Sequence, residues 1–265
     1  MTPSRVAAGD EIEVEACWST QAPLTRDYTV FVHLIDSEMN RIGERHTYPG
    51  LGRLPTSRWP LNQVFCETYR LTVEPWADIP RRYQVEVGLF DAETGERLPA
   101  EAPEGDPANP PVVGSISVIP KEADPPNPMA TRDVTIGGFT TLTGFDTPFR
   151  GAPGETIDVT LYWKANQTQP PDAIAFVHLW TPGSDKPVAQ HDARPRQGEY
   201  PTIYWVEGDV IPDRHPIALP DDLEPGSYPL WAGLYLRADG TRLTAIGPNG
   251  RLPDNLVPLG TVQVK

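Results

Sequence analysis

Apolar and polar residues alternate one by one near the start of the chain. Within residues 11–18 the polar positions are mostly glutamate, and the apolar ones are Ile12, Val14, Ala16 and Trp18. A period of two is typical of a β-strand that turns one face to a core and the other to water. The same pattern returns in residues 156–163. The alternation therefore predicts half-buried strands, and its recurrence indicates a repeat.

A second motif gives the length of that repeat. Phe-Val-His-Leu occurs at residues 31–34 and again at residues 176–179, an offset of 176 − 31 = 145. Pro-Thr-x-x-Trp follows at residues 55–59 and 201–205, an offset of 201 − 55 = 146. Matches that keep their order at an almost constant offset predict two tandem copies of one β-sandwich module.

The repeat also sets the expected boundaries. We place the first copy at residues 1–120, a proline-rich linker at residues 121–132 and the second copy at residues 133–265. The second copy opens with residues 134–146, which we interpret as one further strand with a glycine bulge. Subtracting the offset places its counterpart before residue 1, so we expect the first copy to lack its opening strand. Either the chain is a piece of a longer protein, or another chain supplies that strand.

Composition supports an all-β fold with many turns. The 265 residues include 32 prolines and 22 glycines, too many for long helices. The hydrophobic content of 38% and the seven tryptophans argue against disorder. The net charge of −14 argues against nucleic acid and adsorption to anionic membranes. Since no apolar run is long enough to span a bilayer, we expect no membrane insertion by this chain.

The two cysteines of the chain, Cys17 and Cys66, both lie in the first copy. Their counterparts in the second copy are Tyr162 and Pro212. Since the second copy lacks this pair, the module can fold without it. A pair of cysteines that adds stability to one copy only is typical of a disulfide formed in an oxidising compartment. Two unrelated buried thiols remain the alternative.

Two histidines, His33 and His178, are the first candidates for chemistry because each copy carries one. They occupy equivalent strand positions in separate modules, so we do not expect one metal ion to bind both. A structural hydrogen-bonding role is the favoured interpretation. The sequence holds no nucleophile elbow, HExxH, P-loop, dinucleotide-binding or EF-hand motif. We therefore predict a non-enzymatic protein with no catalytic residue, no metal site and no cofactor.

Charged and imidazole side chains gather in two segments of the second copy. This predicted ligand loop consists of His191, Asp192, Arg194, Asp213 and His215. Side chains of these types could together bind an anion or sugar hydroxyls. The first copy has other residues at these places, among them Arg45, His46 and Glu67, so we do not expect the cluster to be maintained there.

Aromatic residues that the two copies do not share predict a contact surface. The predicted contact face of the second copy consists of Tyr162, Trp180, Trp231 and Tyr235. An outward aromatic face is suited to protein association or to stacking on sugars. The alternative is that a loop or the other module covers these side chains.

The combined motifs resemble a known group of modules. They are Pro-Gly-Glu before an alternating strand, Tyr-Trp at its end, Phe-Val-His-Leu, Pro-Thr-x-x-Trp and Gly-Leu-Tyr. This set resembles the immunoglobulin-like β-sandwich modules of bacterial surface proteins, which also follow the membrane part of some glycosyltransferase-like proteins. The resemblance covers essentially the whole chain. It implies two tandem immunoglobulin-like antiparallel β-sandwich domains, an extracellular or cell-surface location and no catalytic role.

Two functions follow from these patterns. The favoured one is an extracellular structural protein, a homo-oligomer or filament whose subunits associate through strand complementation and the aromatic contact face. The alternative is a carbohydrate-binding accessory module of a glycosyltransferase-like or surface protein, with a glycan as its partner.

Overall fold

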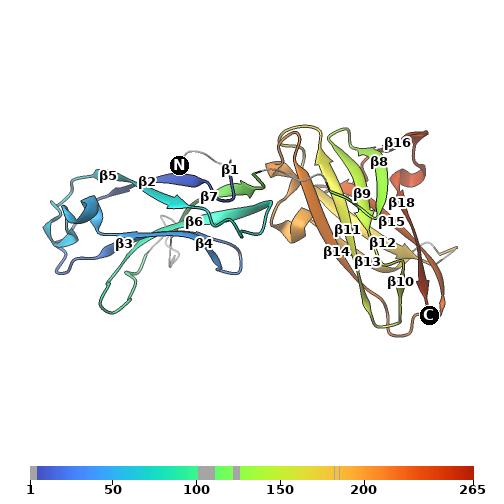
Figure 1. Ribbon diagram of the computed structural model, residues 1–265, viewed down its shortest axis with the longest axis horizontal. Coiled ribbons are helices and arrows are strands. Elements are labelled where there is room, and N and C mark those ends of the chain that lie inside the picture. Colours follow the sequence, from blue (N-terminus) through green and yellow to red (C-terminus); the bar gives the residue numbers. More distant parts are fainter. Residues whose placement is uncertain (1–4, 101–110, 122–125, 182, 185) are drawn as a thin grey trace. The chain divides into compact units, whose positions relative to one another are not determined.

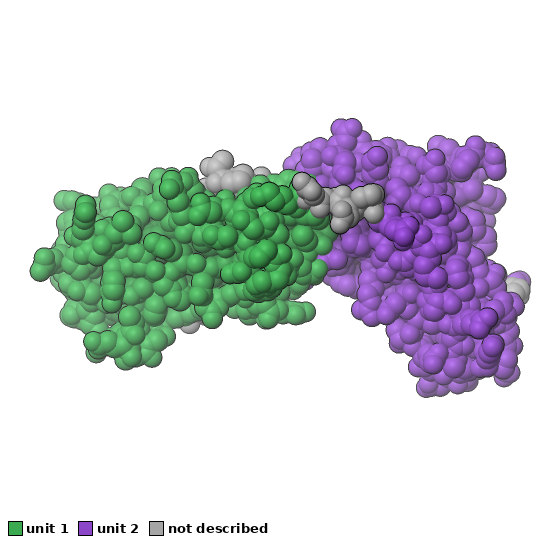
Figure 2. All heavy atoms as spheres, in the orientation of Figure 1, with its two compact units in different colours: residues 1–122 green, residues 123–265 purple. Residues whose placement is uncertain are grey.

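The computed structural model describes residues 5–100, 111–121, 126–181, 183–184 and 186–265. The chain divides into two compact units, residues 1–122 and 123–265, which Figure 2 shows in different colours; Figure 1 labels their strands. Regular structure in the described residues is β-strand, apart from short 3-10 segments, so the predicted all-β class is confirmed. These segments are η1 (Pro49–Gly52), η2 (Thr56–Arg58), η3 (Pro195–Gly198), η4 (Thr202–Tyr204) and η5 (Pro253–Asn255).

The first unit pairs a large sheet with a small one. In spatial order, the large sheet contains β1 (Arg5–Ala7), β7 (Val112–Ile119), β6 (Arg81–Phe90), β3 (Thr29–Ile35) and β4 (Arg41–Thr47). The small sheet contains β2 (Glu11–Trp18) and β5 (Phe65–Thr72). Alternate side chains of both sheets meet in one core, for example Val14 of β2 and Val32 of β3. The period-two pattern thus builds a sandwich, as predicted.

The second unit repeats this plan with more strands. One sheet contains β10 (Arg150–Gly151), β18 (Val257–Val264), β15 (Gly226–Leu236), β12 (Ala173–Trp180) and β13 (Pro187–Ala193). The other contains β14 (Val210–Ala218), β11 (Thr156–Ala165), β9 (Thr140–Asp146), β8 (Ala130–Ile136), β16 (Ala245–Gly247) and β17 (Gly250–Arg251). The core between them includes Trp163 and Trp205, both 0% exposed.

Strand order in each unit is that of an immunoglobulin-like sandwich. Both units set a four-stranded antiparallel group, β7-β6-β3-β4 or β18-β15-β12-β13, against a second sheet. The long ladders are antiparallel. One short edge strand per unit pairs in parallel instead, β1 with β7 and β10 with β18. The parallel pairs add a detail that the sequence pattern does not specify.

Two expectations about the start of the second copy need correction. Residues 134–146 are not one bulged strand but parts of a hairpin, β8 and β9, because the chain reverses at Gly137 and Gly138. Both glycines have positive φ, at 61° and 77°, which side chains other than glycine rarely adopt. The expected linker, residues 121–132, is also too long, since β8 already begins at Ala130. Residues 122–125 of that linker lie outside the described part of the chain.

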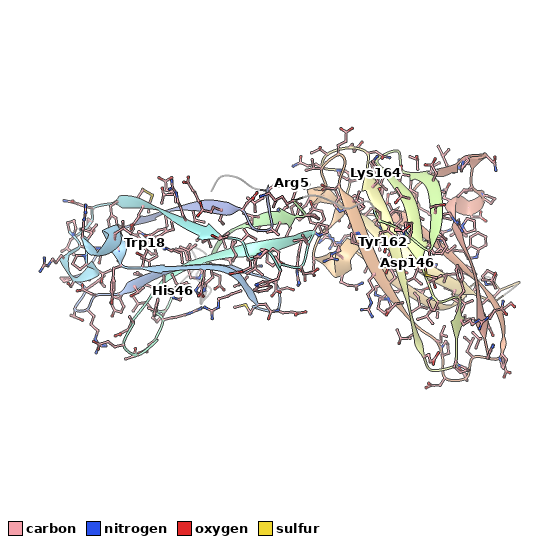
Figure 3. The ribbon with its side chains drawn as sticks, in the orientation of Figure 1. Arg5, Trp18, His46, Asp146, Tyr162 and Lys164 are labelled. Carbon is pink, nitrogen blue, oxygen red and sulfur yellow. A yellow bond between two sulfur atoms is a disulfide. The ribbon has the colours of Figure 1, made fainter. Side chains whose placement is uncertain are left out.

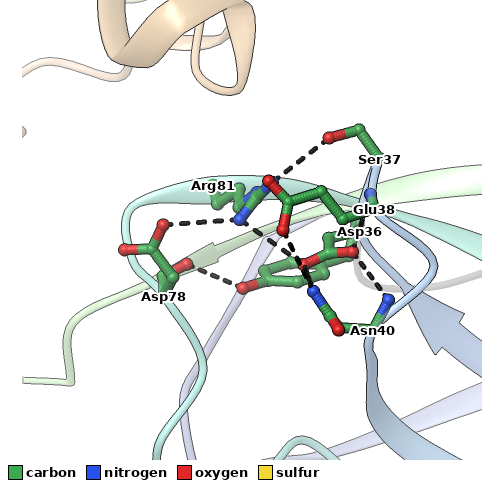
Figure 4. Close-up of polar contacts among 7 residues, drawn as sticks. Asp36, Ser37, Glu38, Asn40, Asp78 and Arg81 are labelled. Atoms are coloured by element: carbon green, nitrogen blue, oxygen red, sulfur yellow. Dashed lines mark hydrogen bonds and ion pairs between the residues drawn. The ribbon is translucent and has the colours of Figure 1, made fainter.

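A polar cluster holds the turn between β3 and β4 (Figure 4). Asp36 Oδ1 accepts hydrogen bonds from the backbone N–H groups of Glu38 and Asn40, at 2.9 and 2.8 Å. Arg81 Nη1, at the start of β6, lies 3.5 Å from Asp36 Oδ2 and 3.4 Å from Asp78 Oδ2. The turn is therefore tied to the start of β6 through the buried Asp36 carboxylate, which helps to position the strand β4 that follows it.

Candidate functional site

The main difference between the two units is the environment of the equivalent strands β2 and β11. Strand β11 pairs with β14 on one side and β9 on the other. Strand β2 pairs with β5 through all eight of its residues. Within the residues that the structure describes, no strand pairs with the other edge of β2. Among the described residues, the backbone donors and acceptors on that edge of β2 are therefore not part of a ladder.

The core beneath this edge is also less well covered. In the second unit, Leu161 and Trp163 of β11 are 0% exposed. Their counterparts in β2, Ala16 and Trp18, are only half-buried. Figure 3 labels Trp18 near one end of the first unit. The open edge, meaning the unpaired side of Glu11–Trp18, thus offers apolar surface as well as backbone hydrogen-bonding groups.

A disulfide joins the two strands of the small sheet. Cys17 of β2 and Cys66 of β5 are directly opposite in the ladder, and their sulfur atoms are bonded. The equivalent pair in the second unit, Tyr162 and Pro212, lies in a sheet where β11 has strands on both sides. A two-stranded sheet is marginally stable by itself. The disulfide is therefore found in the unit whose smaller sheet has fewer strands to stabilise it.

Histidine and charged side chains occupy the outer face of the first unit's large sheet. Val30, Val32 and Leu34 of β3 point into the core, so Phe31 and His33 point to the opposite face. His33 is 3% exposed, and its ring lies over Phe31 at a centroid distance of 4.8 Å. The Arg97 guanidinium also lies over the Phe31 ring, 4.6 Å from the ring centre. The buried histidine predicted to be structural thus belongs to a covered outer layer.

Neighbouring strands supply the partners of His33. Its Nε2 lies 2.8 Å from Nε2 of His46 on β4, and its Nδ1 lies 3.6 Å from the carboxylate of Glu86 on β6. Burial lowers the pKa of His33 to about 4, with smaller contributions from His46, Arg41 and Arg97. Burial also raises the pKa of Glu86, against the opposing effect of Arg97 and Arg41. The layer therefore favours a neutral imidazole.

This shift predicts acid sensitivity of the first unit. The unfolded chain binds a proton at His33 below about pH 6.5, while the folded unit resists doing so down to about pH 4. Stability should therefore fall as pH drops through this window, by up to about 3 kcal/mol. The raised pKa of Glu86 acts with the opposite sign and reduces the net effect. Denaturant unfolding at pH 7 and pH 4.5 measures the loss.

The variant His33→Gln is the control for that measurement. It keeps a polar side chain of similar length but cannot titrate, so its loss of stability between the two pH values should be smaller. The groups facing His33, namely Glu44, Arg41, His46, Glu86 and Arg97, remain in both proteins. An equal loss in the two proteins would assign the acid effect to other groups.

The second unit carries an equivalent outer layer with different chemistry. His178 Nε2 lies 2.8 Å from Oδ1 of Asp192, and the His178 ring lies 4.6 Å from that of Phe176. Burial, followed by the neighbouring Asp192, raises the pKa of Tyr235. The register places Trp231 opposite His178. These side chains share one face of the sheet that contains β12, β13 and β15.

The predicted contact face does not form as one surface. Trp180, Trp231 and Tyr235 belong to that outer layer, and all three are half-buried. Tyr162 lies on β11, in the other sheet of the sandwich. Its hydroxyl donates to Asp146 Oδ2 at 2.7 Å (Figure 3), which together with burial raises the pKa of Tyr162 to about 12. Alternation along single strands identified outward residues, but it could not show that two different sheets carry them.

The predicted ligand loop is divided in the same way. His191, Asp213 and His215 point between the sheets, whereas Asp192 lies on the outer face with His178. Arg194 forms an ion pair with Asp172 instead of joining either group. Because neighbouring residues of a strand point to opposite faces, His191 and Asp192 are separated by the sheet itself. The five residues therefore do not form one binding site.

Three of these residues build a buried polar network. Asp213 and His215 are 0% exposed, and Asp213 accepts hydrogen bonds from Trp163 Nε1 at 3.1 Å and from the backbone N–H of Arg196 at 2.7 Å. His215 Nε2 lies 3.0 Å from Asp213 Oδ2, and His215 Nδ1 lies 3.0 Å from Nδ1 of His191. Since His191 and His215 come from edge strands of different sheets, the network links the two sheets.

The first unit carries a different polar network at the corresponding place, where Glu67 and Tyr69 stand in the positions of Asp213 and His215. Glu67 accepts from the Gly50 N–H at 3.1 Å and from the Tyr69 hydroxyl at 3.0 Å. Trp18 Nε1 donates to the same hydroxyl at 3.0 Å. In both units an acidic residue accepts a hydrogen bond from a 3-10 segment. The residue two positions further along the strand is His215 in the second unit and Tyr69 in the first, and it contacts that acid in each case. The repeat aligns Glu67 with Asp213, so the sequence already indicated that both copies carry an acidic residue at this place.

Comparisons with known proteins were made at the levels of sequence and structure. No family model and no curated protein matches the chain. A protein described as membrane anchored, from Corynebacterium diphtheriae, aligns over 99% of this chain and 60% of its own, with 13% identity and a TM-score of 0.25. The chain thus spans about three fifths of that protein's solved length. The tandem V-type regions of VCBP3, a v-region-containing chitin binding protein, align over 88% of this chain and 90% of theirs, with 11% identity and a TM-score of 0.22.

These likenesses carry no functional argument, because both TM-scores are low. The immunoglobulin-like assignment rests on strand order and on the sandwich core of each unit. In the described part of the chain, none of the helices has the length and apolar character needed to cross a bilayer.

Proposed function

We propose that this protein is a non-enzymatic structural module that acts outside the cytoplasm and assembles by accepting a β-strand along the open edge of β2. The observation that carries the proposal is the difference between β2, which is paired with β5, and β11, which is paired on both sides. Addition of a strand would satisfy the backbone groups along that edge. The Cys17–Cys66 disulfide supports a location in an oxidising compartment.

The second unit shows what the incoming strand would resemble. Strand β9 lies against β11 there and contributes Leu142 and Phe145 to the core, both 0% exposed. A partner strand with two apolar side chains at this spacing would cover the half-buried Ala16 and Trp18. The β9 of this chain is already paired on both sides, with β11 and β8. We therefore propose a strand from a partner chain, with the β9 pattern, as the occupant.

A peptide with the sequence of residues 138–148 tests this proposal. It should bind the intact chain and slow backbone hydrogen exchange in residues 11–18, because the new ladder protects the amides that face the open edge. A control peptide with aspartate in place of Leu142 and Phe145 should bind at least about tenfold more weakly, because it cannot cover the apolar surface. Hydrogen exchange followed by mass spectrometry locates the protected segment.

Light scattering of the intact chain provides the second readout. Reversible, concentration-dependent association that the peptide inhibits would support assembly through this edge. A chain that stays monomeric at every concentration and shows no peptide-dependent protection of residues 11–18 would contradict the proposal.

The carbohydrate-binding alternative receives less support from the geometry. The residues expected to bind a glycan are split between an outer face and the space between the sheets. Trp231, expected to stack on a sugar, is half-buried beside the His178 layer. We therefore retain strand complementation as the conclusion.

A further inference from the structure

Three side chains able to bind a metal ion converge on the outer face of the first unit. His33 lies in the middle of β3, and Glu44 and His46 lie two residues apart on the neighbouring strand β4. The ladder places His33 directly opposite Glu44, and residues two apart on a strand share a face. One ligand atom from each of the three side chains lies within 4.8 Å of the other two.

The two imidazoles are arranged as a pair of ligands. Their Nε2 atoms face each other at 2.8 Å, and the ring planes are inclined by 53°. Zinc bound to histidine lies about 2.0–2.1 Å from each nitrogen, so a small opening of the pair would admit one ion. Glu44 receives the Arg41 guanidinium on Oε2, at 2.6 Å. Its second carboxylate oxygen remains a possible ligand atom.

The other nitrogen of His33 supplies an independent indication. Among the residues that the structure describes, buried His33 Nδ1 has no hydrogen-bond partner, as is also the case for His178 Nδ1 in the second unit. The carboxylate of Glu86, a residue that is 2% exposed, lies 3.6 Å away, just beyond hydrogen-bonding distance. A metal-binding histidine characteristically donates its second ring N–H to such a carboxylate, which orients the ring and fixes the tautomer. A shift of roughly 0.7 Å would bring the two atoms to the usual hydrogen-bonding distance.

We propose that His33, Glu44 and His46 bind one divalent transition-metal ion of the zinc type, with Glu86 orienting His33 from behind. Two imidazoles and one carboxylate are the donor set that suits zinc and its neighbours better than magnesium or calcium. The three protein ligands leave a fourth position for water or for a side chain of a partner. The site would fasten β4 to β3 at the outer layer of the sheet. It lies on the large sheet, whereas the open edge belongs to the small one, so neither proposal depends on the other.

The second unit has the same strand arrangement but lacks this set of three metal ligands. His178 occupies the place of His33, but Gln190 and Asp192 stand opposite and diagonal to it, where the first unit has Glu44 and His46. His178 satisfies its Nε2 with Asp192 directly. Among the described residues, the three-ligand group occurs in the first unit alone.

Titration of the intact, metal-stripped chain tests the site. Zinc binding measured by calorimetry should reach one ion per chain, and cobalt should produce the visible absorption of a low-symmetry complex. His46→Ala and Glu44→Gln, both exposed positions that should leave the fold intact, are each expected to weaken zinc binding at least about 100-fold. Glu86→Gln should weaken it roughly 10–100-fold. The control Glu38→Gln removes an exposed carboxylate from the same unit and should bind zinc like the natural chain.

The results that would overturn the proposal are equally specific. One such result is that calorimetry detects no heat of zinc binding and cobalt produces no visible absorption, up to millimolar concentrations of the metal. The other is an unchanged zinc affinity in both His46→Ala and Glu44→Gln. Circular dichroism of each variant verifies its fold, so a loss of binding can be assigned to the missing ligand.

Discussion

Replacing both Cys17 and Cys66 with serine is expected to lower the free energy of unfolding of the first unit by about 4 kcal/mol, as a closed loop of this length implies. The two sulfurs are separated by 49 positions in sequence, so the bond removes considerable freedom from the unfolded chain. It also joins a two-stranded sheet in which β2 has one partner among the described residues. Denaturant unfolding, resolved by hydrogen exchange into the two units, measures the loss.

The second unit is the internal control for this prediction. Both cysteines of the chain lie in the first unit, so neither the substitutions nor a reducing agent should change the protection of residues 126–265. If the β9-like peptide binds the open edge, it should restore part of the stability of the serine variant. Equal stability of the oxidised chain and the serine variant would show that the disulfide does not stabilise the first unit.

Replacing Asp213 with alanine is expected to destabilise the second unit by roughly 3–5 kcal/mol, the range for breaking a buried, charged hydrogen-bond network. The change removes the acceptor for Trp163 Nε1 and for the Arg196 N–H, and it takes away the partner of His215. These groups lie where water has little access, because Trp163, Asp213 and His215 are 0% exposed. Denaturant unfolding followed by tryptophan fluorescence reports the change.

Asp158→Ala provides the matched control. Asp158 is also an aspartate on a strand of the second unit, but it is exposed and pairs with the exposed Arg214 at 2.7 Å. Surface ion pairs contribute about 0–1 kcal/mol, so this variant should stay close to the natural chain. Similar losses in the two variants would contradict a special role for the buried network.

The β-sandwich repeat could be predicted from the sequence because alternation is a local property. Inward and outward positions along β2 and β11 follow directly from a side-chain period of two. The constant offset then carries the interpretation from one copy to the other. The outward aromatic residues could not be assembled into one face by this reasoning, because Tyr162 and Trp231 belong to different sheets. Which strands become neighbours depends on packing between distant segments.

For the candidate sites, too, the sequence identified equivalent positions but not the partners of each residue. Phe-Val-His-Leu marked His33 and His178 as equivalent, but their partners differ, since His33 faces His46 and His178 faces Asp192. Glu86 joins the His33 layer from a strand more than fifty positions away in sequence. The repeat itself therefore identified the framework, while the residues that give each copy its chemistry were visible only as differences.

The sequence by itself determined an all-β chain built from two copies of one module, because a period of two and a recurring motif need no knowledge of tertiary contacts. Tertiary structure alone decided that β2 keeps an open edge, that His33, Glu44 and His46 converge, and that Asp213 is buried. Each of these depends on strand register and on the packing of one sheet against another. Hydrogen bonds and burial between residues distant in the chain set both, so no local pattern encodes them.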